Sequence, residues 1–151
     1  MGRKIAREST MKLLYQMDLN NDYSDKIASL FFDNIELSVD EKEYVEHAVK
    51  NIRNNLKHID NIIQKHTHGW NIYRIAKVDL AILRIAVYEQ LYREDIPIEV
   101  SINEAIEIGK KYSTEESSKF INGILGSFAR ARDDKKDRKS TRLNSSHRWS
   151  S

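Results

Sequence analysis

Hydrophobic residues recur every three or four positions along most of the chain, which is the spacing of one face of an α-helix. In the first half of the chain this pattern predicts helices over residues 4–18, roughly 25–35 and 38–56. Ile59, Ile62 and Ile63 indicate a further short helix that ends near Gly69. We therefore expect four helices before residue 70.

Residues 72–92 differ from the other segments because hydrophobic side chains surround the predicted helix on nearly every side. A helix that is apolar all round belongs at the centre of a molecule. Its end is expected before Pro97, because proline disfavours helical geometry in the residue that precedes it. Two more helices, over about 100–112 and 113–128, follow. The sequence thus predicts an all-α protein of about seven helices.

Two of the predicted helices begin with a capping box, in which a serine and a glutamate three residues later satisfy free backbone N–H groups. Ser38 and Glu41 form the first such pair, and Ser113 and Glu116 form the second. Both pairs directly precede a hydrophobic stripe, so we expect helices to begin at both places.

The composition agrees with this helical prediction and limits the chemistry. The 151 residues include 5 Gly and 1 Pro, too few turn residues for a β-sandwich or barrel. With no Cys, the chain has no disulfides, thiolate nucleophiles or cysteine zinc sites. At 32% charged residues the sequence is too polar for a membrane span, and no signal-like segment opens it. We expect a cytoplasmic protein.

The end of the chain lacks the helical pattern. Residues 140–151 show no hydrophobic periodicity and are half Ser and Asn, which fits either a cloning remnant or a native disordered tail. We therefore expect a helical domain over residues 1–134 and a basic, polar tail over 135–151, with Trp149 outside the core.

Charge is distributed unevenly along the sequence. Both ends are basic, whereas residues 13–129 hold 13 basic and 19 acidic residues. Arg3, Lys4 and Arg7 are spaced to lie on one helical face, where they form a compact positive patch. Tyr15 lies two turns beyond Arg7 and offers a ring for base stacking. The same residues also fit a solvated surface patch and a half-buried aromatic, so the pattern alone leaves nucleic-acid binding open.

Catalytic and metal-binding motifs are missing from the sequence. It contains no Gly-rich phosphate loop, no G-x-S-x-G elbow and no H-E-x-x-H pair. His66 and His68 would point to different sides of a helix, and we interpret the histidines as solvated. The acid pairs at 40–41 and 115–116 fit the first turns of helices better than general acid–base couples. We expect a protein that is not an enzyme and needs no cofactor or metal.

Several segments together resemble the NusB family of bacterial transcription antitermination factors. They are RESTMKLLYQ at 7–16, DLAILR at 79–84, INEAIE at 102–107 and FINGIL at 120–125. The resemblance covers about residues 3–128, and the last two segments in this order are highly specific to the family.

The resemblance implies a fold of two three-helix bundles that share a central helix. It also implies a non-enzymatic role in which the protein pairs with the ribosomal protein NusE. The pair would bind the boxA element of nascent RNA and help to load an antitermination complex on RNA polymerase, notably during ribosomal RNA transcription.

The family's functional positions can be carried onto this sequence one residue at a time. The positions implied for RNA binding are Arg3, Lys4, Arg7, Tyr15, Glu116, Lys119, Phe120 and Asn122. Those implied for the partner-facing side are Asp79, Leu80 and Leu83, with Asp79 pairing with a basic residue of NusE. We expect the first and last helices to converge into one strip that binds unpaired RNA.

Two other functions remain open at this point. The chain could be a helical protein-interaction module without an RNA role, or a domain related to the NusB-like leading domain of certain RNA methyltransferases. The second is disfavoured because no catalytic or cofactor-binding segment follows. The sequence also leaves open whether the protein is a monomer or a homodimer.

Overall fold

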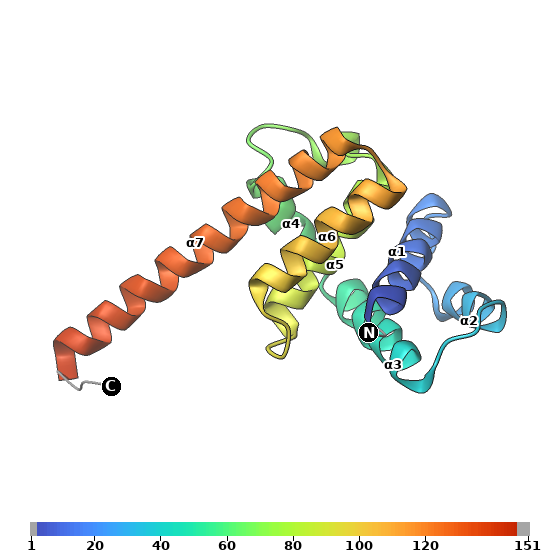
Figure 1. Cartoon of the computed structure of the whole chain (residues 1–151), viewed down its shortest axis with the longest axis horizontal. Helices are drawn as coiled ribbons and strands as arrows, with labels where there is room; N and C mark the ends of the chain where they lie inside the picture. The colour runs from blue at the N-terminus through green and yellow to red at the C-terminus, as the bar shows by residue number, and fades with distance from the viewer. Residues whose placement is uncertain (1–2, 148–151) are drawn as a thin grey trace.

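The computed structural model describes the backbone of residues 3–147 and the side chains of residues 3–133. Within that range the chain forms seven α-helices and one 3₁₀ turn, without a β-strand (Figure 1). This confirms the all-α prediction and the number of helices. The elements are α1 (Arg3–Leu19), α2 (Asp25–Asp33), α3 (Val39–Asn54), α4 (Leu56–Lys65), η1 (Ile72–Arg74), α5 (Lys77–Tyr92), α6 (Ile98–Tyr112) and α7 (Glu115–His147).

Helix α5 is the centre of the molecule. Every residue from Asp79 to Gln90 is buried, as expected for a helix that is apolar all round. It packs against α1, α3, α4, α6 and α7. In Figure 1, α1, α2 and α3 gather on one side of α5, while α6 and α7 lie on the other. This arrangement is compatible with two bundles that share a central helix.

The two predicted capping boxes have different outcomes. Before α3, the Ser38 hydroxyl accepts a hydrogen bond from Glu41 N at 3.2 Å, and the Glu41 carboxylate accepts one from Ser38 N at 2.8 Å. Before α7, the cap is Thr114, whose hydroxyl accepts from Ser117 N at 2.9 Å. The second box was placed one residue too early, because Thr114 offers the same hydroxyl as Ser113 in a better position.

The segment predicted as one helix over 72–92 is divided. Ile72–Arg74 form the 3₁₀ turn η1, Ile75 and Ala76 are extended, and α5 begins only at Lys77. The Asn71 side chain caps η1 by accepting from Tyr73 N at 2.8 Å. Ile72 and Ile75 are both buried, so a turn and a helix place the same hydrophobic residues in the core. Hydrophobic spacing could not distinguish the two.

Helix α7 is longer than the hydrophobic pattern predicts. It continues to His147, beyond the expected helix end at 128 and the expected domain boundary at 134, and projects away from the body (Figure 1). Among the residues of α7 up to 133, whose side chains are described, the last buried hydrophobic residue is Phe128. Trp149 lies outside the described residues. No helix in the described part of the chain is long and apolar enough to cross a membrane.

Candidate nucleic-acid interface

Arg7 is buried and fully engaged by carboxylates. Its Nε lies 2.7 Å from Glu89 Oε2, its Nη1 lies 3.6 Å from Glu104 Oε1, and the residue is 5% exposed. Tyr44 also donates to the Glu89 carboxylate. Burial alone would lower the pKa of Arg7, but the charge of Glu89 raises it above the usual value. Arg7 therefore lies beneath the surface and not on the exposed patch expected from its spacing, because Glu89 on the buried helix α5 requires a cation.

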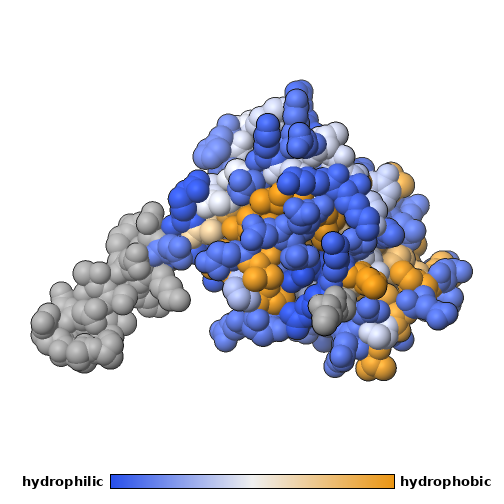
Figure 2. Space-filling model, viewed as in Figure 1, coloured by the Kyte–Doolittle hydropathy of each residue, from blue (hydrophilic) through white to orange (hydrophobic). Residues whose placement is uncertain are grey.

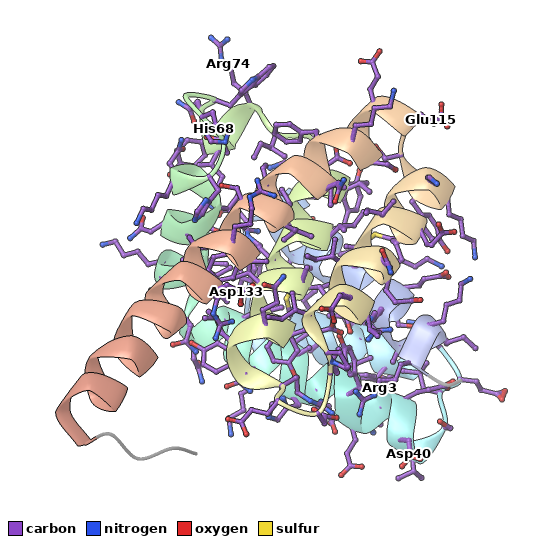
Figure 3. The ribbon with its side chains drawn as sticks, turned by 60° about the vertical axis from the view of Figure 1, so that its left-hand side comes forward. Arg3, Asp40, His68, Arg74, Glu115 and Asp133 are labelled. Atoms are coloured by element: carbon purple, nitrogen blue, oxygen red, sulfur yellow. The ribbon has the colours of Figure 1, made fainter. Side chains whose placement is uncertain are left out.

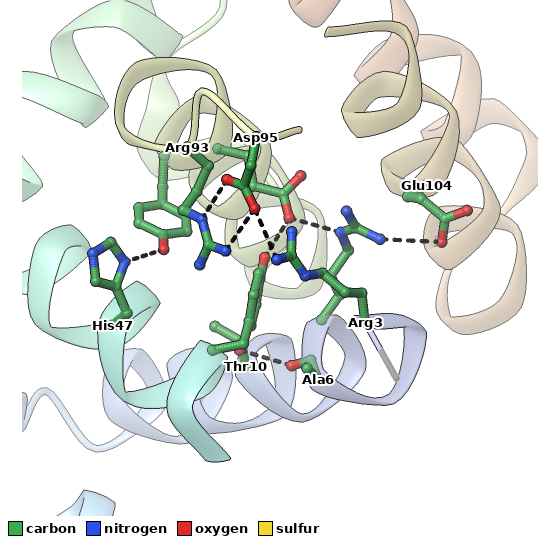
Figure 4. A network of polar contacts seen from close by, with 11 residues as sticks. Arg3, Ala6, Thr10, His47, Arg93, Asp95 and Glu104 are labelled. Carbon is green, nitrogen blue, oxygen red and sulfur yellow. Dashed lines mark hydrogen bonds and ion pairs between the residues drawn. The ribbon is translucent and has the colours of Figure 1, made fainter. Parts of the chain in front are cut away.

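Arg3 belongs to a second, more exposed network (Figure 4). Its Nη2 lies 2.8 Å from Asp95 Oδ2, and Arg93 Nε lies 2.9 Å from Asp95 Oδ1. These two arginines hold the pKa of Asp95 well below its ordinary value. Both guanidinium groups also lie near the Tyr44 ring, with the Arg3 Cζ 5.8 Å and the Arg93 Cζ 5.6 Å from its centre. Lys4 is exposed and, within residues 3–133, forms no ion pair.

The middle of α1 contacts the end of α6. Glu8 accepts hydrogen bonds from Lys111 Nζ at 3.1 Å and from the Tyr112 hydroxyl at 2.8 Å. Lys12 Nζ lies 5.4 Å from the centre of the Tyr112 ring. Tyr15, which is half-buried, follows Lys12 on the same helix. This half of α1 is therefore close to the connection that leads into α7.

The predicted residues of α7 are mostly exposed. Glu116, Lys119 and Asn122 are exposed, and Phe120 is half-buried with its ring 6.0 Å from the Trp70 ring. Because Thr114 caps the helix, the Glu116 side chain is not held in a capping box.

The structure brings some predicted RNA-binding residues to one end of the molecule and leaves others at a distance. Figure 3 shows Glu115, at the start of α7, at the opposite end from Arg3. At 1.5 Å per residue, Arg3 and Tyr15 are separated by about 18 Å along α1. Tyr15, Glu116, Lys119 and Phe120 thus belong to the α7 end, while Arg3 and Lys4 lie at the far end of α1.

The predicted partner-facing residues lie inside the protein. Asp79, Leu80 and Leu83 are 5%, 6% and 0% exposed, because this part of α5 is covered on all sides. Asp79 Oδ1 is buried and has no hydrogen-bond partner among the described atoms. Leu83 is a core residue and forms no part of the surface.

One histidine differs from the solvated interpretation. His66 is buried, its Nδ1 lies 2.8 Å from the Ser127 hydroxyl, and burial lowers its pKa. His47 Nδ1 contacts the Tyr88 hydroxyl. His66 therefore has a structural role between helices that spacing in the sequence did not indicate, whereas His47 is exposed, as expected.

Exposed aromatic residues between α4 and α5 were not among the predicted site residues. Trp70 is 56% and Tyr73 90% exposed. Tyr73 falls in the segment over 72–92 that was predicted as a core helix, and Trp70 falls between two predicted helices, so the exposure of neither was predicted. The absence of acidic residues around them was the signal that could have drawn attention to this segment.

Comparison with known proteins identifies relatives along most of the chain. The model of the NusB family matches residues 4–130. The chain is 45% identical to the transcription antitermination protein NusB of Acetivibrio thermocellus, over 87% of this chain and 91% of the relative. It is 47% identical to the protein of that name from Clostridium botulinum, over 83% and 96% of the two chains.

Solved structures agree with the sequence relatives. Thermotoga maritima NusB superimposes with a TM-score of 0.79 at 36% identity, covering 86% of this chain and 92% of that one. A chain in the crystal structure of antitermination factors NusB and NusE in complex with dsRNA gives a TM-score of 0.76 at 28% identity, covering 85% and 96%. Because the family model matches residues 4–130 and the all-helical fold agrees with solved NusB structures, this chain belongs to the NusB family.

Proposed function

We propose that this protein is a transcription antitermination factor that binds boxA-type single-stranded RNA together with the ribosomal protein NusE. The observation that carries the proposal is its likeness, over 85% of its length, to a chain crystallised with NusE and dsRNA. The relatives named as antitermination proteins support the same role.

The charges of the first helix favour RNA binding that is shared with a partner. Arg7 is neutralised by Glu89 and Glu104, and Arg3 is paired with Asp95. Of Arg3, Lys4 and Arg7, Lys4 is then the residue that can bind a phosphate without first breaking an ion pair within residues 3–133. A surface with so few available cations supports only weak contacts with the RNA backbone. A basic partner would supply the missing cations and would suit the acidic body of this chain.

The contacts we propose for RNA combine phosphate and base recognition. Arg3, Lys4 and Lys119 contact phosphates, while the rings of Tyr15 and Phe120 stack on bases. Glu116 and Asn122 form hydrogen bonds with base edges. Arg7 supports α1 from beneath through Glu89 and does not touch RNA.

The proposed contact with NusE lies at the first turn of α5. Asp79 has a buried oxygen without a partner among the described atoms, and such an atom is costly unless a donor reaches it. A basic side chain of NusE would supply that donor once the side chains that cover this turn move aside, because Asp79 is 5% exposed, and Leu80 and Leu83 support the turn from the core.

Binding of a labelled boxA RNA with and without NusE tests the proposal. We expect at least tenfold tighter binding by the pair than by this protein alone, measured by fluorescence anisotropy. A duplex of the same sequence serves as the control and should bind more weakly, because its bases are paired. Equal affinity with and without NusE would contradict the cooperative model.

A further inference from the structure

A segment without carboxylates connects α4 to α5. Residues 61–78 contain Lys65, Arg74 and Lys77, together with two histidines, and include no Asp or Glu. The surrounding region, residues 13–129, has six more acidic than basic residues. Lys77 is paired with Asp18 of α1 at 2.9 Å, whereas Lys65 and Arg74 are exposed. These two residues form a local positive surface on an acidic body, and their charge complements a polyanion.

The same segment presents large aromatic side chains to solvent. Tyr73 is 90% and Trp70 56% exposed, which makes both of them unusually accessible for rings of this size. The Trp70 ring lies edge-on to the ring of Phe120, with the centroids 6.0 Å apart. The segment thus extends the aromatic surface of α7 by two further rings.

Hydrogen bonds hold this loop in one conformation. Gln64 Nε2 donates to the Trp70 carbonyl at 2.5 Å, and Gln64 Oε1 accepts from Ile72 N at 2.9 Å. Asn71 Oδ1 accepts from Tyr73 N at 2.8 Å, which fixes the turn that carries Tyr73. The rings are therefore displayed on a preorganised loop, so that a ligand would lose little free energy in ordering it.

Cations lie beside the rings. Figure 3 shows Arg74 at the end of the molecule where α7 begins, and its side chain is exposed. Lys119, one position before Phe120, is exposed as well. Cations interleaved with exposed rings are typical of surfaces that bind single-stranded nucleic acid, in which the rings stack on bases and the cations contact phosphates.

We propose that Trp70, Tyr73 and Arg74 form, with Phe120, a stacking surface for unpaired RNA bases. This inference rests on the proposed function and extends it, because it assigns RNA contacts to the loop between α4 and α5. Trp70 and Tyr73 stack on successive bases, and Arg74 neutralises a phosphate between them. The absence of carboxylates over 18 residues favours a polyanion over a basic protein partner, which would need carboxylates to pair with its cations.

The test measures RNA affinity and NusE affinity separately for variants of the full chain. We expect Tyr73→Ala and Trp70→Ala each to weaken binding of single-stranded boxA RNA about tenfold, the loss typical of one stacked base. Trp70→Phe, which keeps a ring, should retain most of the affinity. Arg74→Gln should weaken binding and reduce its salt dependence, whereas Lys57→Gln, an exposed lysine of α4, should do neither.

Tyr73→Ala is the decisive variant, because a side chain that is 90% exposed can be removed without disturbing the core. Unchanged RNA affinity with weakened NusE binding would overturn the inference and assign the surface to the protein partner. Unchanged affinity for both ligands would also overturn it. If the unmodified protein with NusE binds no RNA, the proposed function fails instead, so that the two failures can be told apart.

Discussion

Buried and exposed arginines of the first helix have different physical roles. Arg7 lies in a buried network in which Glu89 receives both its guanidinium and the Tyr44 hydroxyl. Removing one member would leave another charge buried without a partner, which is costly. The Arg3–Asp95 pair is different, because the two side chains are 41% and 51% exposed. Exposed pairs contribute about 0 to 1 kcal/mol, so an RNA phosphate could displace Asp95 at little cost.

Replacing Asp95 with Asn should therefore increase RNA affinity. The change frees Arg3 from an intramolecular carboxylate, and we expect about threefold tighter binding to boxA RNA, in line with the small free energy of an exposed pair. Fluorescence anisotropy titrations of the Asp95→Asn protein measure the effect. Glu94→Gln is the matched control, because this neighbour is exposed and forms no ion pair within residues 3–133. Equal gains in the two variants would mean that only net charge matters.

At the scale of helices, the sequence was sufficient to predict which helices form and in what order, but not where each of them begins and ends. The all-round hydrophobicity of α5 correctly indicated its central position, because burial on every side requires apolar residues on every side. The break at Ile75 and Ala76 was not predictable from spacing, since Ile72 and Ile75 are buried in either conformation. The choice of Thr114 over Ser113 as the cap depends on local backbone geometry that the residue types do not specify.

The candidate site was less predictable than the fold. Helical spacing placed Arg3, Lys4 and Arg7 on one face, but whether that face is exposed depends on Glu89, which is 82 positions away from Arg7 in the sequence. The exposure of Trp70 and Tyr73 was missed as well, because it too depends on how distant segments of the chain pack. Long-range packing determines which chemically suitable residues reach the surface.

Two glycines test how closely α6 and α7 pack. A Cβ at Gly109 would lie 3.2 Å from Ile121 Cδ1 and from Ser118 Oγ, whereas a Cβ at Gly123 would have no atom within 4 Å. Gly123→Ala should therefore stabilise the protein by about 0.5–1 kcal/mol through helix propensity. Gly109→Ala should destabilise it by about 1 kcal/mol, because Ile121 is fully buried and cannot move freely. Urea denaturation measures both, and a gain in stability for Gly109→Ala would contradict the close packing.

At the scale of the whole molecule, one residue of the central helix connects several elements. Arg84 of α5 binds Asp60 of α4 through two hydrogen bonds of 2.8 Å each. Its Nη1 also donates to the Tyr23 hydroxyl at 3.0 Å and lies 3.6 Å from Asp18 of α1. Burial alone would lower the pKa of Arg84, but these partners raise it above the usual value. The charge is thus buried at the point where α1, α4 and α5 meet.

Loss of the Arg84 guanidinium should lower the stability of the whole molecule. Arg84→Met keeps a long apolar stem but leaves Asp60 and Asp18 without their shared cation, so we expect the free energy of unfolding to fall by about 3 kcal/mol. Arg53→Met is the matched control, because Arg53 pairs with Asp25, whose side chain is 92% exposed, and it should lower stability by less than about 1 kcal/mol. Chemical denaturation followed by circular dichroism measures both variants. Because α5 contributes to the packing of both helical groups, the Arg84→Met protein should still unfold in a single transition at a lower denaturant concentration. Two separate transitions would show that the helices on either side of α5 are stabilised independently of each other.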